Sequence, residues 1–167
     1  MYKRRCLEDK LDRGVVNVYN NYEINNETLA LLYIKENLTK VVEISGSFTV
    51  DNNIINIVDH SCKFFGSSYL GRIEGSKNLI GMNYKLPIII EESREFIFFP
   101  TIASKNKDCM WISLNNMEKY YKDGKNSIIK FKNNVSLKLP ISFGSLENQV
   151  HRSNMLLLNL KKRKKVS

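Results

Sequence analysis

Apolar and polar positions alternate in short runs between residues 15 and 50, a pattern that indicates β-strands. Asparagine pairs and the dipeptide Ser45-Gly46, which are typical of turns, separate these runs. We therefore predict a strand meander made of the segments VVNVY, TLALLYIK, TKVVEIS and SFTV.

A helical period replaces this alternation after residue 50. Apolar residues recur there at spacings of three and four, which predicts a helix with one buried face. The residues on this face are Ile55, Val58, Cys62 and Phe65. Asp51 is suited to cap the N-terminus, because its carboxylate can accept hydrogen bonds from the first free N–H groups. Gly66 can end the helix in a left-handed conformation.

The middle of the chain predicts a connection, a strand pair and a short helix. Residues 66–81 hold Gly66, Gly71, Gly75 and Gly81, and we expect a tight connection there. The apolar runs PIII and FIFF, separated by EESRE, predict two strands buried on both faces. Ser113 can cap a short helix of sequence LNNMEKYYKD that ends at Gly124.

Residues 128–139 have the period of a β-hairpin. Ile129 and Phe131 share one face with Val135, Leu137 and Leu139. The opposite face carries Lys130, Lys132, Ser136 and Lys138. The Asn133-Asn134 pair tolerates the positive φ that a two-residue type I′ turn requires.

A final helix is predicted from about Ser145 to the basic tail. Its apolar face is formed by Leu146, Val150, Leu157 and Leu160, and its polar face by Asn148, Arg152, Asn159 and Arg163. The fold class is α+β, with an N-terminal strand meander, a central amphipathic helix, two further β-hairpins and a C-terminal helix. We predict a single domain over residues 1–160 and a disordered basic tail over residues 161–167.

Charge suggests a polyanionic partner. Lys and Arg total 26 against 17 Asp and Glu, a net charge of +9, while 43% of residues are hydrophobic. Such a chain can bury a core, which argues against intrinsic disorder, and its charge favours nucleic acid or anionic lipid as a partner. Six cations and no acidic residue lie from residue 150 onward.

The sequence favours a compartment inside the cell. Residues 1–14 lack the apolar stretch of a signal peptide, and no window approaches about 18 consecutive apolar residues, so we expect no membrane partner. The three cysteines are odd in number and widely spaced, as reduced thiols are. We expect a cytoplasmic, nucleoid-associated protein.

The sequence gives little support for a catalytic site or a metal site. His60, Cys62, Cys109 and His151 are possible zinc ligands, yet they form only one close pair where a zinc site usually has two. A thiol nucleophile requires an accessible, electropositive site, and Cys62 lies on the buried face. The motifs of phosphate loops, Rossmann folds, zincins and serine hydrolases are absent. We therefore expect neither enzyme activity, nor a metal, nor a cofactor.

Two segments are candidates for DNA contact. Phosphate oxygens accept hydrogen bonds from backbone N–H groups, hydroxyls and cations. Residues 63–77 offer these groups at Lys63, Ser67, Ser68, Tyr69, Arg72 and Lys77. Asn, Gln and Arg can contact base edges or a narrow minor groove, and the final helix offers Asn148, Gln149, Arg152 and Arg163. The basic face of the predicted hairpin also favours nucleic acid as a partner. For this face and for both segments, the alternative is an ordinary connection or a solvated face.

Several separated blocks resemble the competence transcription factor family, ComK. They are IVDHSCKFFGSSYLGR (residues 57–72), IFFPT (97–101), WIS (111–113) and LPISFGSLENQVHR (139–152). The blocks occur in the order of the family, and the resemblance covers roughly residues 22–158.

The resemblance implies a bacterial activator of DNA-uptake and recombination genes that also acts on its own promoter. It implies a homodimer or tetramer on paired AT-rich promoter boxes, contacted largely through the minor groove, with RNA polymerase as a direct or indirect partner. Longer family members carry a tail recognised by a proteolytic adaptor. Residues 161–167 show no such segment, so the sequence does not support adaptor–Clp protease control. A non-selective nucleoid-associated or RNA-binding protein is the alternative function.

Overall fold

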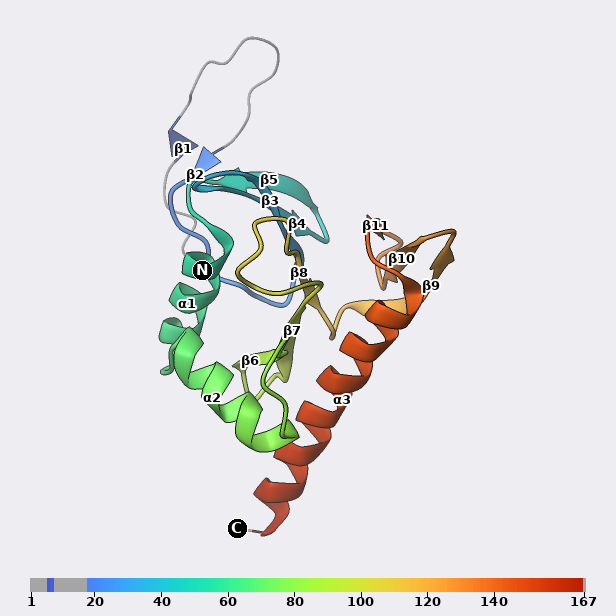
Figure 1. Cartoon of the computed structure of the whole chain (residues 1–167). Helices are drawn as coiled ribbons and strands as arrows, with labels where there is room; N and C mark the ends of the chain where they lie inside the picture. The colour runs from blue at the N-terminus through green and yellow to red at the C-terminus, as the bar shows by residue number, and fades with distance from the viewer. Residues whose placement is uncertain (1–5, 8–17, 167) are drawn as a thin grey trace.

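The predicted meander forms the centre of a large sheet. The computed structural model describes residues 6–7 and 18–166. Strands β3 (Thr28–Lys35), β4 (Leu38–Glu43) and β5 (Gly46–Val50) pair in antiparallel fashion, which confirms the prediction (Figure 1). β2 (Val18–Tyr19) pairs in parallel with β5, while residues 15–17 of the predicted first strand lie outside the described residues.

The sheet continues on the other side of β3 with strands from the middle of the chain. Its order is β1-β2-β5-β4-β3-β8-β7-β6, where β1 is Cys6–Leu7, β6 is Ile88–Glu91, β7 is Phe96–Pro100 and β8 is Trp111–Ser113. β8 lies between β3 and β7, with Ala30 and Phe99 both paired to Ile112. The predicted pairing of PIII with FIFF is confirmed, and β7 is buried along its whole length.

The first helix, α1 (Ile54–Phe64), is confirmed with a different N-cap. The side chain of Asn53 accepts a hydrogen bond from the Asn56 N–H at 2.9 Å, whereas Asp51 is exposed outside the helix. Asparagine caps helices as well as aspartate does, so composition alone could not choose between them. The buried face is Ile54, Ile57, Val58, Ser61 and Cys62, while Ile55 and Phe65 are half-buried. Gly66 follows the helix with φ +81°, as predicted.

The predicted connection over residues 66–81 is instead largely a second helix, α2 (Tyr69–Ile80). The Ser68 hydroxyl caps it by accepting a hydrogen bond from the Gly71 N–H at 3.0 Å, and Gly81 ends it with φ +66°. Glycine lowers helix propensity by only about 1 kcal/mol per residue, and tertiary packing can offset that. α2 packs against α1, α3 and β6, and buries Ser76 and Ile80.

The short helix predicted before Gly124 is wrong, because this segment forms part of a second sheet. Its order is β11-β10-β9, with β9 at Met117–Asp123, β10 at Asn126–Phe131 and β11 at Ser136–Leu139. Ser113, the predicted cap, is buried in β8, and Gly124 lies in the β9–β10 turn with φ +59°. Pairing with β10 therefore outweighs the local helix propensity of this segment.

The hairpin of β10 and β11 is confirmed, but its turn differs from the prediction. The Phe131 N–H donates to the Val135 carbonyl at 2.8 Å, and the Asn134 N–H donates to the Phe131 carbonyl at 3.0 Å. Asn134 has φ +68°, and Asn133 does not share its positive φ. These bonds define a loop of residues 132–134 that ends in one left-handed residue, in place of a two-residue type I′ turn.

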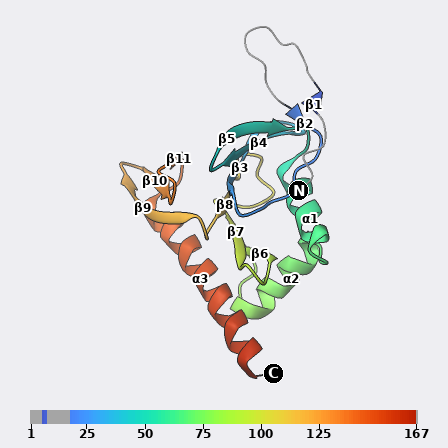
Figure 2. The same cartoon turned by 180° about the vertical axis from the view of Figure 1, so that it is seen from behind.

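The last helix, α3 (Phe143–Val166), includes the basic run that was predicted to be disordered. Lysine and arginine form helices well, and cations near a helix C-terminus are favoured by the helix dipole. Leu146 and Val150 are buried as predicted, whereas Leu157 and Leu160 are half-buried. Figure 2 shows that α2 and α3 converge toward the C-terminus, while the β9–β11 sheet lies at the opposite end of α3.

Candidate nucleic-acid interface

A carboxylate joins the end of α1 to the start of α2. Asp59 accepts a hydrogen bond from the Tyr69 N–H at 2.9 Å and pairs with the Lys63 ammonium at 2.7 Å. The Lys63 hydrogen bond and the Tyr69 N–H both lower the pKa of Asp59. Lys63 is exposed, so its charge reaches solvent from this α1–α2 corner.

The hydroxyl-bearing residues of this corner also make contacts that stabilise the fold. Ser68 caps α2, and the Tyr69 hydroxyl donates to the Ser104 hydroxyl at 3.3 Å. The Tyr69 ring meets Trp111 edge to face, with centroids 6.1 Å apart. Ser67 is half-buried, and its backbone N–H donates to the Cys62 carbonyl at 2.9 Å. Lys63 is therefore the predicted contact here with the most accessible charge.

Arg72, predicted as a DNA contact, has an internal partner. Its guanidinium lies 2.9 Å from the Glu92 carboxylate, and its side chain is only 15% exposed. The Nε atom is buried and makes no hydrogen bond. Arg72 thus connects α2 to the turn between β6 and β7, and little of it faces solvent.

Two glutamates make that turn a junction between helices, while Glu91 bonds to Ser93 and Arg94 within the turn. We call Glu91, Glu92 and Glu95 the acidic turn. The Lys161 ammonium lies 2.8 Å from the Glu95 carboxylate, and the Lys164 ammonium lies 3.1 Å from that of Glu92. The acidic turn therefore binds α2 through Arg72 and the end of α3 through two lysines. This pairing gives a further reason why the basic run is helical.

The acidic turn predicts a pH dependence of stability. The hydrogen bond from Arg72, followed by that from Lys164, lowers the pKa of Glu92 below its ordinary value of 4.5. A carboxyl whose pKa is lowered by folding stabilises the fold fully above the unfolded value, and this contribution is lost as the pH falls through the folded value. We expect the unfolding free energy of Arg72→Met, measured with urea from pH 7 to below 4.5, to fall less steeply than that of the wild type.

Lys77→Met is the matched control, because it removes a cation from the same helix without touching the acidic turn. Its stability should follow the pH dependence of the wild type. Identical pH dependence in all three proteins would show that Arg72 does not govern the titration of Glu92.

Gln149 was predicted to contact DNA, and the structure places it in the interior. It is 2% exposed, and its amide donates to the Pro100 carbonyl at 2.6 Å and the Lys85 carbonyl at 3.0 Å. Every fourth or third residue of α3 faces the sheet, and Gln149 falls on this buried face beside Val150. Its neighbour Asn148 is exposed.

The two arginines predicted on α3 contact backbone carbonyls of segments that precede it in this chain. The Arg152 guanidinium donates to the Tyr84 carbonyl at 3.1 Å and lies 5.5 Å from the centroid of the Tyr84 ring. Arg163 donates to the Asn78 carbonyl at 3.2 Å, at the end of α2. Lys77, one residue before Asn78, pairs with Glu74 at 3.1 Å. The structure thus brings Lys77 and Arg163 to the α2–α3 junction, apart from the α1–α2 corner.

Sequence reasoning missed the basic residues of β9. Lys119 and Tyr121 lie on β9, which was predicted as a helix, and they pair with Lys130 and Ile128 of β10. The dipeptide Asp123-Gly124 is the signal that could have revealed this strand, because it is typical of hairpin turns.

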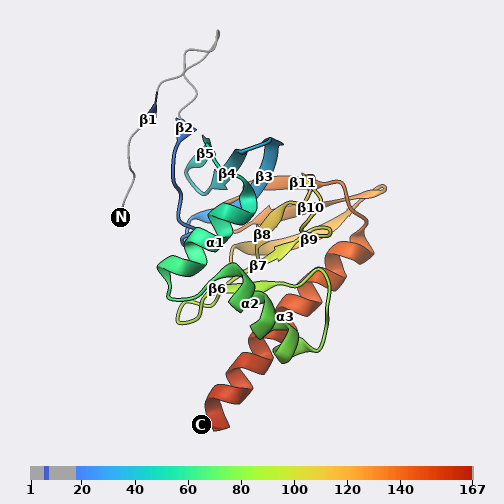
Figure 3. The same ribbon diagram turned by 60° about the vertical axis from the view of Figure 1, so that its left-hand side comes forward.

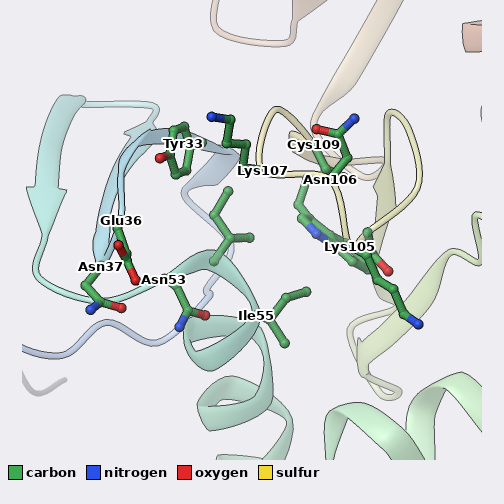
Figure 4. Close-up of a pocket in the computed structure, with 12 residues that line it drawn as sticks. Tyr33, Glu36, Asn37, Asn53, Ile55, Lys105, Asn106, Lys107 and Cys109 are labelled. Carbon is green, nitrogen blue, oxygen red and sulfur yellow. The ribbon is translucent and has the colours of Figure 1, made fainter.

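A cavity of about 530 Å³ opens between the β3–β4 turn, the start of α1 and the loop before β8. Figure 4 shows Asn37 and Asn53 on one side of it and Lys105 and Asn106 on the other. Cys109 also lines the cavity, but burial raises the pKa of its thiol, and burial raises that of Cys62 to about 11. Neither thiol is suited to act as a thiolate nucleophile.

The described residues contain neither a metal site nor a membrane-spanning helix. No three His, Cys, Asp or Glu side chains among them lie close enough together to hold a metal ion. Within the same residues, no helix has the length and apolar character needed to cross a membrane.

Comparison with known proteins identifies the family. Residues 19–165 match the family described as ComK protein. The chain is 35% identical over 140 residues to the competence transcription factor of Bacillus subtilis strain 168, which covers 81% of this chain and 73% of that protein. No solved structure matches the chain. The match over nearly the whole described chain shows that the protein belongs to the ComK family.

Proposed function

We propose that the protein is a DNA-binding transcription activator of competence genes, which serve DNA uptake and recombination. The observation that carries this proposal is the 35% identity to a relative named competence transcription factor. The net charge of +9 supports it, because an excess of cations favours a polyanionic partner. A transcription factor of this kind acts by binding and needs no catalytic centre.

The finer proposal concerns the mode of binding. We propose that a homodimer or tetramer binds AT-rich promoter boxes largely through the minor groove and recruits RNA polymerase directly or indirectly. AT tracts have a narrow minor groove with a strong negative potential, which attracts Arg and Lys side chains. The predicted contacts that remain at least partly exposed support contact with DNA at more than one place, the α1–α2 corner, the α2–α3 junction and the rest of α3. They are Lys63, Ser67, Lys77, Asn148, Arg152 and Arg163.

The test is the affinity of purified protein for its own upstream region, compared with a GC-rich duplex of the same length. We expect protection of AT-rich sequence in a footprint and tighter binding to the AT-rich duplex. Affinity should fall steeply with salt, with a slope of log K against log salt of about −0.9 for each phosphate neutralised. Equal affinity for the two duplexes at every salt concentration would contradict selective binding.

A second candidate is a nucleoid-associated or RNA-binding protein without promoter selectivity. The basic end of α3 favours it, since Lys162 and Lys165 are exposed and pair with no carboxylate of the described residues. Lys162→Gln/Lys165→Gln tests it while leaving the ion pairs of Lys161 and Lys164 with the acidic turn intact. Selective binding predicts a variant that still prefers AT-rich DNA. Loss of all duplex binding would favour the second candidate.

A further inference from the structure

The β9–β11 sheet has one buried face and one open face. Ser127, Ile129 and Phe131 of β10 are buried, and Ile129 and Phe131 pack into a core with α3. Tyr120 of β9 stacks on Phe143 at the start of α3, with ring centroids 5.7 Å apart. Side chains alternate along a strand, so the intervening residues form the opposite side. We call it the outer face, and it consists of Lys119, Tyr121, Ile128, Lys130, Ser136 and Lys138.

The outer face is accessible and strongly basic. Lys119, Ser136 and Lys138 are exposed, and Tyr121 is 43% exposed. Residues 117–139, which span the sheet, contain six lysines against two acidic residues, Glu118 and Asp123, and three of these lysines lie on the outer face. Figure 3 shows the three strands at the end of α3 that is remote from the C-terminus.

The strand register places two of these lysines directly opposite one another. Lys130 pairs with Lys119 on β9 and with Ser136 on β11. Opposed residues of neighbouring strands have Cβ atoms about 5 Å apart, and like charges at such positions destabilise a sheet. Lys138 has a counter-charge in Asp123 at 2.8 Å, whereas Lys119 and Lys130 form no ion pair within the described part of the chain. The fold therefore retains a repulsive pair without an internal carboxylate.

We propose that the outer face binds the phosphate backbone of duplex DNA, with Lys119 and Lys130 as the phosphate contacts. An anion between the two ammonium groups would turn their repulsion into attraction, and phosphates supply such charges at regular spacing along the duplex. The Tyr121 hydroxyl, one residue pair along the face, is a further donor suited to phosphate oxygens. The inference rests on the proposed DNA-binding function and assigns it a surface beyond the contacts predicted on α1, α2 and α3.

The experiment compares two double variants of the full chain on the AT-rich upstream duplex across a series of salt concentrations. Lys119→Gln/Lys130→Gln removes the opposed pair. Lys105→Gln/Lys107→Gln removes the same charge from two exposed lysines of the loop before β8. We expect the first variant to bind more weakly and to reduce the slope of log K against log salt by about 1.8, the value for two phosphates. The control variant should keep the slope of the wild type.

Two further measurements distinguish a phosphate contact from a base-specific contact and from a loss of stability. Phosphate contacts carry no sequence information, so the ratio of affinities for AT-rich and GC-rich duplexes should be unchanged in Lys119→Gln/Lys130→Gln. Its thermal midpoint should equal or exceed that of the wild type, because the variant relieves a like-charge pair. A lower midpoint together with weaker binding would instead assign the two lysines to the fold and overturn the proposal.

Other outcomes also overturn the inference. A wild-type slope in Lys119→Gln/Lys130→Gln, or equal losses in both double variants, would exclude a specific role for the outer face while leaving the proposed function standing. Lost binding to phosphatidylglycerol vesicles with unchanged DNA binding would assign the face to a membrane. A wild type that binds no duplex would instead remove the proposed function, and the inference with it.

Discussion

Replacing Trp111 by alanine is expected to lower the free energy of unfolding by about 3–5 kcal/mol. The side chain is 1% exposed and belongs to the core between the large sheet and α1. Trp111 lies on β8, where it pairs with Leu31 of β3 and Pro100 of β7, and its ring contacts Tyr69 at the start of α2. The substitution would therefore leave a void where both halves of the sheet meet a helix.

Urea denaturation followed by circular dichroism measures this loss. Phe64→Ala is the matched control, since it also truncates an aromatic residue but at a position that is 61% exposed. We expect the control to cost less than about 1 kcal/mol, as most exposed positions do. A Trp111→Ala protein as stable as the control would contradict the central placement of β8.

Gln149→Ala is expected to destabilise the protein by about 2–4 kcal/mol, although glutamine is a residue type suited to contact DNA bases. Its amide donates to the Pro100 carbonyl in the interior and to the Lys85 carbonyl at a partly buried position, and both carbonyls would lose that donor. A buried acceptor left without a partner costs about 1–3 kcal/mol, which applies to the Pro100 carbonyl, and the partly buried Lys85 carbonyl adds a smaller loss. Arg152 would also lose the Gln149 side-chain oxygen, which now lies 3.2 Å from its guanidinium.

Asn148→Ala provides the comparison at the adjacent, exposed position. It should leave the unfolding free energy nearly unchanged, and any effect on DNA affinity would then report a surface contact. For Gln149→Ala, affinity corrected for the folded fraction should match the wild type. A fully stable Gln149→Ala protein with weakened DNA binding would restore the role predicted from the sequence.

The elements predictable from the sequence are those whose local pattern agrees with their final packing. β3, β4, β6, β7 and the β10–β11 hairpin are of this kind, because their apolar residues face the cores where periodicity places them. α2 was missed because its glycines disfavour a helix and its apolar residues form only a weak stripe. Its helical form depends on contacts with α1, α3 and β6, which a local pattern does not contain.

The candidate site was also predicted only in part. Residue type correctly predicted that Lys63 and Asn148 are exposed, and their contact with DNA stays a prediction. It could not show that Arg72 faces Glu92 or that Gln149 lies inside, because both facts depend on chain segments distant in sequence. The helical structure of the basic run could not be predicted for the same reason, because its ion-pair partners belong to the acidic turn, which is distant in sequence.

The position of β8 has a consequence for the order in which the chain can fold. The strands β3, β4 and β5 follow one another and can pair as soon as they are synthesised, but the free edge of β3 awaits Trp111 and Ile112. Such long-range pairing slows folding, because a large loop must close before the contact forms. Leu29, Ala30 and Leu31 are all buried in the finished protein, so the nascent meander presents an apolar, unpaired edge. Until β8 arrives, this unpaired apolar edge exposes the growing chain to aggregation.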